Sequence, residues 1–213
     1  MKPKGMVLDK RVSEVREAAA RLFSTRGFLE TSMDEIALAA HLSKGGMYHY
    51  FKSKTEILYA ILSDFMDQVL ADIDVLVGSA KSPEEKLSFL IRRHVETYAL
   101  HRHSARVLLK EANNLPKKHL KKIHDKERRY LNAVEEIIGD LLGPDTGRDV
   151  LKAVTFSLLG MCNWIYSWYD PQGRIDPGRL SEIIMTIFTK GVRATAAGST
   201  ENCPVSSSCN MFI

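Results

Sequence analysis

Cysteine is scarce in this chain, and long apolar runs are missing. The three cysteines in 213 residues are Cys162, Cys203 and Cys209. They form no disulfide framework, and no Cys/His pattern has the spacing of a zinc site. The N-terminus lacks an apolar signal-peptide core, and no apolar run is long enough to span a bilayer. We therefore expect a reduced, soluble, cytoplasmic chain without a membrane partner or a metal.

Patterns that indicate catalysis are missing as well. The sequence contains neither a recognisable nucleophile motif nor a Gly-rich phosphate loop. An enzyme would have to use His94, Glu96 or His101 as acid or base inside an apolar helical domain, which is a remote alternative. The 7 prolines and 13 glycines fall mostly at the ends of periodic segments. This distribution predicts a mostly helical chain. The missing catalytic motifs predict that it is not an enzyme and carries no cofactor.

What the sequence does contain is a compact two-helix pattern near the N-terminus. Ile36 and Ala40 recur at helical spacing, and Ser43 is suited to cap a second helix just after a short break. Gly45 and Gly46 stand in the first turn of that second helix. Glycine is unfavourable in a helix, so the pair indicates a backbone that must approach something closely. Two helices in this arrangement fit a helix-turn-helix, whose second helix enters the DNA major groove.

A series of positions through this stretch also matches a family pattern in order. They are Gly27-Phe28, Thr31-Ser32, Asp34-Glu35-Ile36-Ala37, Ser43-Lys44-Gly45, Tyr48, Phe51 and Ser53-Lys54. On these residues the chain resembles the tetracycline-repressor (TetR) family of bacterial transcription regulators. It departs from the family at Tyr50, where His is frequent, and at Thr55, where Glu is usual. The resemblance implies a homodimeric repressor that binds a palindromic double-stranded DNA operator.

The resemblance also implies which residues meet DNA. They are Thr31, Ser32, Ser43, Lys44, Gly45, Gly46, Tyr48, His49, Tyr50 and Lys54. Hydroxyl groups and the lysine heads can donate to phosphate oxygens, and His49 can reach a base edge. Lys54 begins the next helix, whose N-terminus favours a phosphate. Tyr48 and Tyr50 could equally pack with their hydroxyls outward, whereas Met47 and Phe51 are expected in the core.

The helical periodicity predicts an all-α fold of about nine helices. With the resemblance, it divides the chain into a three-helix DNA-binding domain (1–53), a helical effector-binding and dimerisation domain (54–196) and a disordered tail (197–213). The first helix is expected over residues 9–26, after a loose basic arm. One long helix is expected from Lys54 to about Val77, with an apolar stripe and a solvated acidic face. In the family, this helix connects the domains and transmits the ligand signal.

Further helices are expected over residues 83–101, 104–113, 117–139 and 149–169, and from 177 onward. The last two are strongly apolar and resemble the family's dimerisation pair, which forms a four-helix bundle with the partner subunit. The alternative is that both are buried inside a monomer. Small residues such as Gly160 would let another helix approach closely.

The middle of the chain is strongly basic. Residues 81–130 hold fourteen Lys and Arg against six Asp and Glu, although the whole chain has a net charge of only +4. Three interpretations stay open: a solvated helix face, a second nucleic-acid surface, or attraction of an anionic ligand such as the phosphates of coenzyme A. Four histidines (His94, His101, His103 and His119) could form a metal site or pH switch, or be ordinary core and surface residues.

A second, shorter resemblance concerns the effector. Gly160-x-x-Asn163-Trp164-x-x-x-Trp168-Tyr169, followed by Pro171 and Gly173, is similar to TetR-family repressors of fatty-acid and related catabolism, whose ligands are acyl-CoA thioesters. The candidate ligand-binding residues are Phe89, His94, Tyr98, Met161, Trp164 and Trp168. A hydrophobic or aromatic drug-like effector is the alternative, and the tryptophans could instead anchor a dimer. A helical adaptor without an effector is the remaining class.

Overall fold

The computed structural model describes the backbone of residues 4–197 and the side chains of residues 10–192. The described residues are 80% helical and contain no strand, which confirms the all-α fold. The helices are α1 (Lys4–Arg26), α2 (Met33–Ala39), α3 (Lys44–Tyr50), α4 (Lys54–Leu70), α5 (Ile73–Val77), α6 (Pro83–Leu100), α7 (Arg102–Glu111), α8 (Lys117–Leu142), α9 (Arg148–Asn163), α10 (Ile165–Trp168) and α11 (Pro177–Ala197). A short 3-10 turn, η1 (Ala112–Asn114), follows α7.

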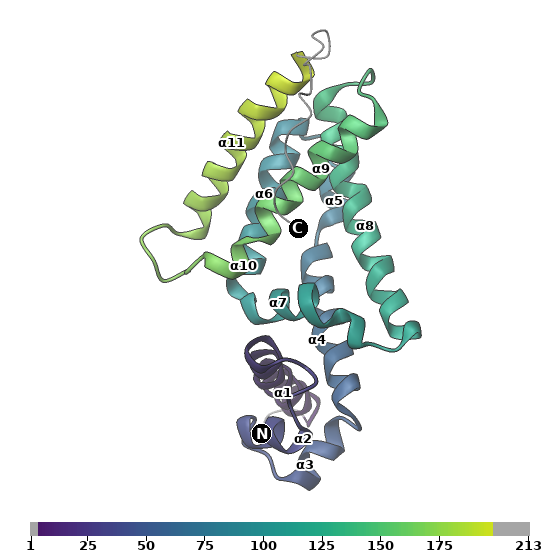
Figure 1. Cartoon of the computed structure of the whole chain (residues 1–213), viewed down its shortest axis with the longest axis vertical. Helices are drawn as coiled ribbons and strands as arrows, with labels where there is room; N and C mark the ends of the chain where they lie inside the picture. The colour runs from purple at the N-terminus through teal and green to yellow at the C-terminus, as the bar shows by residue number, and fades with distance from the viewer. Residues whose placement is uncertain (1–3, 198–213) are drawn as a thin grey trace, which may run out of the picture.

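The helices α1, α2 and α3 form a small unit at one end of an elongated molecule, and α4 runs from it into the larger helical bundle (Figure 1). The expectation of about nine helices is met if α5 and α10 are counted as continuations of α4 and α9. α1 begins at Lys4 rather than at Asp9, so part of the expected loose arm is helical. Residues 1–3 and all but the first residue of the expected tail, with Cys203 and Cys209, lie outside the described residues, whereas residue 197 still belongs to α11.

Local sequence signals explain where the first helices start and stop. Ser32 and Glu35 form a capping box at the start of α2, each side chain bonding the other's backbone N–H. α1 ends at Gly27, whose φ of 98° lies in the left-handed region that favours glycine. Behind these ends, the rings of Phe23 and Phe28 meet edge to face with centroids 5.2 Å apart. The small unit therefore has its own aromatic contact between α1 and the following turn.

The predicted helix over residues 54–77 is interrupted, which corrects the expectation of one continuous helix. α4 ends at Leu70, and Asp72 adopts a left-handed backbone (φ 65°) before α5 begins. Asp tolerates this region better than most residues, because its short polar side chain can bond locally. The apolar stripe runs across the break, since Leu70, Ile73 and Leu76 are all buried. The periodicity therefore identified the buried face but not the kink.

The C-terminal helices also differ in detail from the predictions. The expected helix over residues 149–169 is divided at Trp164 into α9 and α10, and it ends before Pro171. Helix α8 extends to Leu142, and Gly143 (φ 90°) then ends it. Helices α6 and α11 run side by side along one flank of the bundle (Figure 1). No helix within residues 4–197 combines the length and apolarity needed to cross a membrane.

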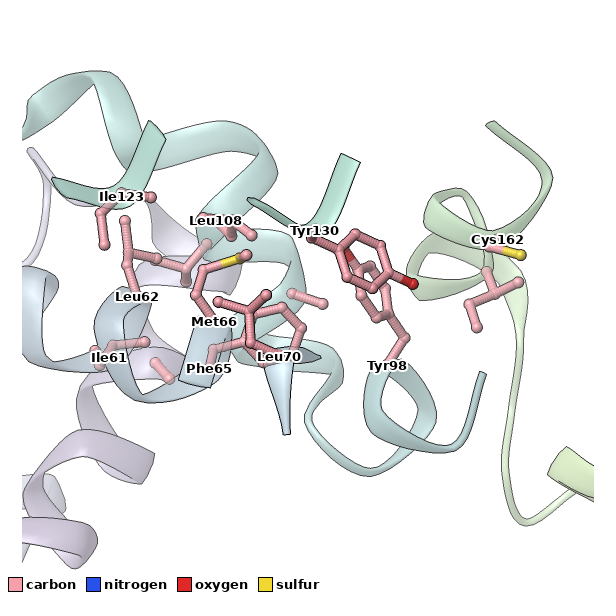
Figure 2. Packing of buried hydrophobic residues seen from close by; sticks show 14 of the residues in the cluster. Ile61, Leu62, Phe65, Met66, Leu70, Tyr98, Leu108, Ile123, Tyr130 and Cys162 are labelled. Atoms are coloured by element: carbon pink, nitrogen blue, oxygen red, sulfur yellow. The ribbon is translucent and has the colours of Figure 1, made fainter. Parts of the chain in front are cut away.

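The bundle core is centred on α4. Figure 2 shows Ile61, Leu62, Phe65, Met66 and Leu70 of α4 facing side chains from the surrounding helices. Phe65 is fully buried, and its ring meets that of Tyr98 edge to face with centroids 5.2 Å apart. α4 is thus held on several sides by apolar contacts.

We predict that Phe65→Ala lowers the free energy of unfolding by about 3–5 kcal/mol, because it removes a buried ring and leaves a cavity. Urea unfolding followed by far-UV circular dichroism, at one protein concentration, would measure the change. Leu38→Ala is the matched control, since Leu38 is exposed, and it should change stability by about 0.5 kcal/mol or less. Similar losses for the two variants would contradict this description of the core.

Candidate nucleic-acid interface and effector cavity

The corner between α2 and α3 is tight and internally bonded. His41 has a left-handed backbone (φ 56°), and the Leu42 N–H donates to the Ala37 carbonyl over 2.8 Å. The hydroxyl of Ser43 then caps α3 by accepting from the Gly46 N–H over 3.1 Å. Met47 is completely buried beneath α3 and Phe51 at its end is buried too, which confirms the prediction that both pack in the core. The corner and these two anchors set the orientation of α3.

The outer face of α3 is exposed and is not covered by any described helix. Ser43, Lys44, Gly45 and His49 are exposed, and Tyr48 is 39% exposed. A Cβ added at Gly45 would meet no atom within 4 Å, so this position is bare backbone on an open surface. Gly46 has a different role, because a Cβ there would come within 3.2 Å of the capping Ser43 Oγ. The two glycines therefore serve different purposes.

Lysine side chains lie near both ends of α3. Lys44 Nζ donates to an Asp34 carboxylate oxygen over 3.0 Å, and this hydrogen bond raises the pKa of Lys44. Both partners are exposed, and such pairs are weak in water. Lys52, which sequence reasoning missed, is exposed and donates to the Tyr48 carbonyl over 2.7 Å. Its position directly after α3, beside the motif, was the available signal.

Lys54 contacts the turn after α1 through both a hydrogen bond and an aromatic ring. Its Nζ donates to the Leu29 carbonyl over 3.1 Å and lies 4.5 Å from the centre of the Phe28 ring. Lys54 also opens α4, which Ser53 caps by accepting from the Glu56 N–H over 3.2 Å. Lys54 therefore connects the turn after α1 to the start of α4. Its ammonium group lies near the N-terminus of α4.

Thr31 does not lie where the resemblance implied. It is only 1% exposed, and its Oγ1 donates to the Gly27 carbonyl over 2.8 Å. The hydroxyl thus closes the turn after α1 and is not available to a phosphate, which corrects the expectation for this residue. Ser32 is exposed, but its hydroxyl already takes part in the capping box with Glu35. Tyr50 is half-buried and packs against the core.

A cavity of about 360 Å³ lies among α4, α6, α7, α8 and α9. Most of its lining is apolar, with Met66, Val69, Leu108, Leu109, Leu131, Phe156 and Leu159. Its polar lining residues are His94, Tyr98, Glu127, Arg128, Tyr130 and Asn163. The volume is near the lower end of the range for sites that hold small organic ligands. Tyr130 and Asn163 were missed from sequence, although Asn163 stands inside the quoted motif.

Two of the six candidate ligand residues, His94 and Tyr98, line this cavity, and their role in binding stays a prediction. Phe89, Met161, Trp164 and Trp168 are not among the residues that line it, and their role in binding stays a prediction too. Trp164 and Trp168 are 62% and 57% exposed. The buried side of α9 carries Leu158 and Cys162, and Trp164 follows Cys162 by two positions, about 200° around a helix. Helical geometry therefore turns this tryptophan outward.

Polar groups at the buried end of the cavity are held neutral. His94 Nδ1 and the Tyr130 hydroxyl are 2.8 Å apart, and the imidazole stacks on the Tyr98 ring at 4.1 Å. Burial lowers the pKa of His94 to about 3 and raises that of Cys162 to about 12. Burial also raises the pKa of the Tyr98 and Tyr130 hydroxyls. No cluster of three potential metal ligands occurs in the part of the chain that the structure describes.

The other histidines have separate environments. His119 stacks on the Tyr59 ring at 4.3 Å. His103 Nδ1 lies 2.7 Å from Ser24 Oγ, and so connects α7 to α1. The Ser24 hydroxyl donates its single proton to the Arg21 carbonyl over 2.9 Å, so His103 is the donor in its own contact. Burial lowers the pKa of His103, and the nearby Arg102, Arg21 and Arg106 lower it further.

The acidic face of α4 and α5 is exposed, as expected, but its carboxylates also pair with basic side chains. Asp64 pairs with Arg16 of α1 at 2.6 Å, and Asp67 pairs with Lys126 of α8 at 2.7 Å. Lys126 also donates to the Ser63 hydroxyl over 2.8 Å, and Arg129 of α8 pairs with Asp74. Part of the basic charge of α8 is therefore used inside the chain. Lys117, Lys118 and Lys121 of α8 form no ion pair with a described residue, so the choice between a solvated face and an anion-binding face stays open for them.

The neutral state of His94 predicts a pH dependence of stability. As pH falls below about 6.5, the unfolded chain protonates this imidazole while the folded chain does not until about pH 3, so folding becomes less favourable. Between about pH 7.5 and about pH 5, the wild type should lose about 2 kcal/mol more stability than His94→Phe, which has no proton to bind. Urea unfolding at both pH values would measure this difference. Parallel pH profiles for the two proteins would show that His94 is not held neutral.

Comparison with known proteins places both parts of the chain in one family. Residues 15–61 match the family described as bacterial regulatory proteins, tetR family, and residues 80–192 match the tetracyclin repressor-like C-terminal domain. The HTH-type transcriptional repressor KstR2 of Mycolicibacterium smegmatis is 27% identical over 190 residues, which cover 85% of this chain and 90% of that protein.

Solved structures show the same similarity in three dimensions. A TetR-family regulator from Bordetella parapertussis is 30% identical with a TM-score of 0.78, covering 83% of this chain and 93% of that one. AibR, solved in complex with isovaleryl coenzyme A and operator DNA, is 27% identical with a TM-score of 0.70, covering 83% and 97%. The chain therefore belongs to the TetR family of bacterial transcription regulators, and it is not an enzyme.

Proposed function

We propose that this regulator is a homodimeric repressor that binds a palindromic operator through α3 and leaves it when a small effector occupies the cavity. One observation carries the first part: α3 is pinned from below by Met47 and Phe51 while its outer face is left open. In two copies related by a two-fold axis, the α3 helices would read half-sites about 34–36 Å apart, or a multiple of that distance.

The residues on the open face suit the tasks of a recognition helix. Gly45 lets the backbone approach the groove, and Lys44 can exchange Asp34 for a phosphate oxygen because their exposed pair is weak. Tyr48 and His49 carry the hydrogen-bonding groups that could meet phosphate or a base edge. Lys54 and the N-terminus of α4 would hold a further phosphate. We retain 1–53 as the DNA-binding unit and 54–196 as the effector-binding unit in this proposal.

Dimerisation would use the exposed apolar face of α9 and α11. Phe156 of α9, Trp164 at its C-terminal end and Ile187 of α11 are each more than half exposed, which is unusual for large apolar side chains on a monomer. Gly160 lies between these α9 residues with open space around it. Phe156 also lines the cavity, so a partner on this face would cover one side of the effector site.

An acyl-CoA is the effector class that we favour. A cavity of about 360 Å³ lined mainly by apolar side chains suits a compact acyl group, and Arg128 stands in its lining beside the basic surface of α8. The coenzyme would have to remain largely outside, where lysines and arginines attract its phosphates. The relative AibR was solved with isovaleryl coenzyme A, which supports this class. A hydrophobic drug-like effector is the runner-up, since the same lining would accept it.

The effector class has a direct test. A panel of acyl-CoAs of increasing size would be added to the complex of the protein with an operator selected from random duplexes. Release of the DNA by compact acyl-CoAs, followed by fluorescence anisotropy, would support the proposal. If no acyl-CoA causes release while uncharged aromatic compounds do, the runner-up is the better description.

We predict that Lys44→Ala weakens operator binding about tenfold and reduces the salt slope of the binding constant by about 1, because one phosphate contact is lost. Asp34 would be left unpaired near the backbone and would add repulsion. Fluorescence anisotropy at several salt concentrations measures both quantities. Lys81→Ala removes an equal charge from an exposed position far along the chain and is the control. Equal losses in the two variants would argue against α3 as the DNA-contacting helix.

We also predict that Ser24→Ala weakens the coupling between effector and DNA by about 2-fold to 30-fold in the ratio of operator affinities with and without effector. The substitution removes the acceptor of His103 and so loosens the contact between α1 and α7. Ser13→Ala is the control on the same helix, because Ser13 bonds the exposed Glu17 over 3.3 Å. An unchanged ratio in Ser24→Ala would exclude this contact from the signalling route.

A further inference from the structure

One ring nitrogen in the cavity wall has no partner. His94 is only 4% exposed, and its Nε2 atom is buried without a hydrogen bond to any described residue. Buried polar atoms are nearly always hydrogen-bonded, because leaving one unpaired is costly. His94 lines the cavity, so a bound molecule is the natural partner for this atom. The Asn163 side chain is the neighbouring group whose hydrogen bonding opposes the fall in the pKa of His94, although its geometry in the described structure does not complete a hydrogen bond to Nε2. Asn163 is therefore the group in the chain with which a ligand would compete for this atom.

The position of the imidazole proton follows from counting partners. His94 is neutral, so one ring nitrogen carries a proton and the other accepts one. If the Tyr130 hydroxyl donates to Nδ1, both of those groups are satisfied and a single N–H remains at Nε2. If Nδ1 donates instead, the Tyr130 proton and the bare Nε2 are both left without partners. The first arrangement leaves fewer buried polar groups unsatisfied, so Nε2 is a donor.

This donor lies at the buried end of the cavity. His94, Tyr98 and Tyr130 are buried, whereas Leu109 and Phe156 are more than 40% exposed and form part of the rim. In Figure 2 the rings of Tyr98 and Tyr130 lie together between the α4 side chains and Cys162. A ligand that enters past the rim therefore presents its leading end to His94, and its trailing end stays near the surface.

We propose that the effector carries a carbonyl oxygen at its leading end, separate from any thioester, and that this oxygen accepts the hydrogen bond from His94 Nε2. The inference rests on the proposed function of the cavity as the effector site, and it specifies the chemistry of that effector. A carboxylate is disfavoured there, because it would bury a charge among neutral groups. A ketone accepts one hydrogen bond and brings no proton that needs a partner of its own.

A matched pair of probes tests this. Cyclohexanecarbonyl-CoA and 4-oxocyclohexanecarbonyl-CoA differ by one ring ketone, and isothermal titration calorimetry would measure both dissociation constants. The wild type should bind the keto compound about 10-fold to 100-fold more tightly. His94→Phe keeps a ring to stack on Tyr98 but has no donor, so its preference should fall to about twofold or less. His119→Phe, which alters a stacked histidine outside the cavity, should keep the wild-type preference.

The outcomes separate this inference from the proposed function. If both probes bind equally to the wild type and both release DNA, the effector class stands and the carbonyl contact is excluded. If neither CoA compound binds, the acyl-CoA class is wrong. Cyclohexanone is then added to the wild type, and ¹⁵N-histidine NMR records whether the Nε2 signal of His94 shifts. A shift of the protonated Nε2 of His94, with His119 unchanged, supports it even if His94→Phe fails to fold. No shift, or an unprotonated Nε2 in the free protein, overturns it.

Discussion

The rest of the structure depends on α4, which is buried at one end beside the helix-turn-helix and at the other end in the cavity wall. The first turns of α4 bury Ile57 and Leu58 beside the helix-turn-helix, and later turns supply Met66 and Val69 to the cavity wall. A helix of 17 residues spans about 25 Å and is stiff along its length. A displacement of α4 at the cavity wall would therefore also act on α1, against which α4 packs. Because the helices are closely packed, α4 is expected to move by switching between distinct packing arrangements and not by bending continuously.

Charged side chains have different environments at the two ends of α4. Around α3, the lysines make exposed, weak contacts that a phosphate can replace. At the buried end of the cavity, burial keeps His94 and Tyr130 neutral, so the specificity there lies in hydrogen-bond donors and acceptors. Between these two ends, Arg16 and Lys126 pair with carboxylates of α4, and Arg129 pairs with Asp74 of α5. The helix is thereby held to both α1 and α8 by ion pairs in addition to its apolar contacts.

Much of the N-terminal unit could be predicted because its signals are local. The caps at Ser32 and Ser43 depend on residues three positions away, and the burial of Met47 and Phe51 follows from helical periodicity. Thr31 was misjudged, because its hydroxyl bonds a carbonyl in a turn whose shape depends on the left-handed Gly27. The kink at Asp72 was missed for a similar reason: Asp permits a left-handed backbone without requiring it.

The sequence by itself determined the helical class, the helix-turn-helix and the family, since these depend on periodicity, capping and a specific ordered motif. Only the tertiary structure decided which side chains share a cavity. His94, Tyr130 and Asn163 come from three helices that are distant in sequence, and the tryptophans of the quoted motif point outward although they neighbour that site along the chain. The physical reason is that a side chain's direction depends on its angle around the helix and on which helix packs there, and periodicity alone cannot say which of two apolar faces will find a partner.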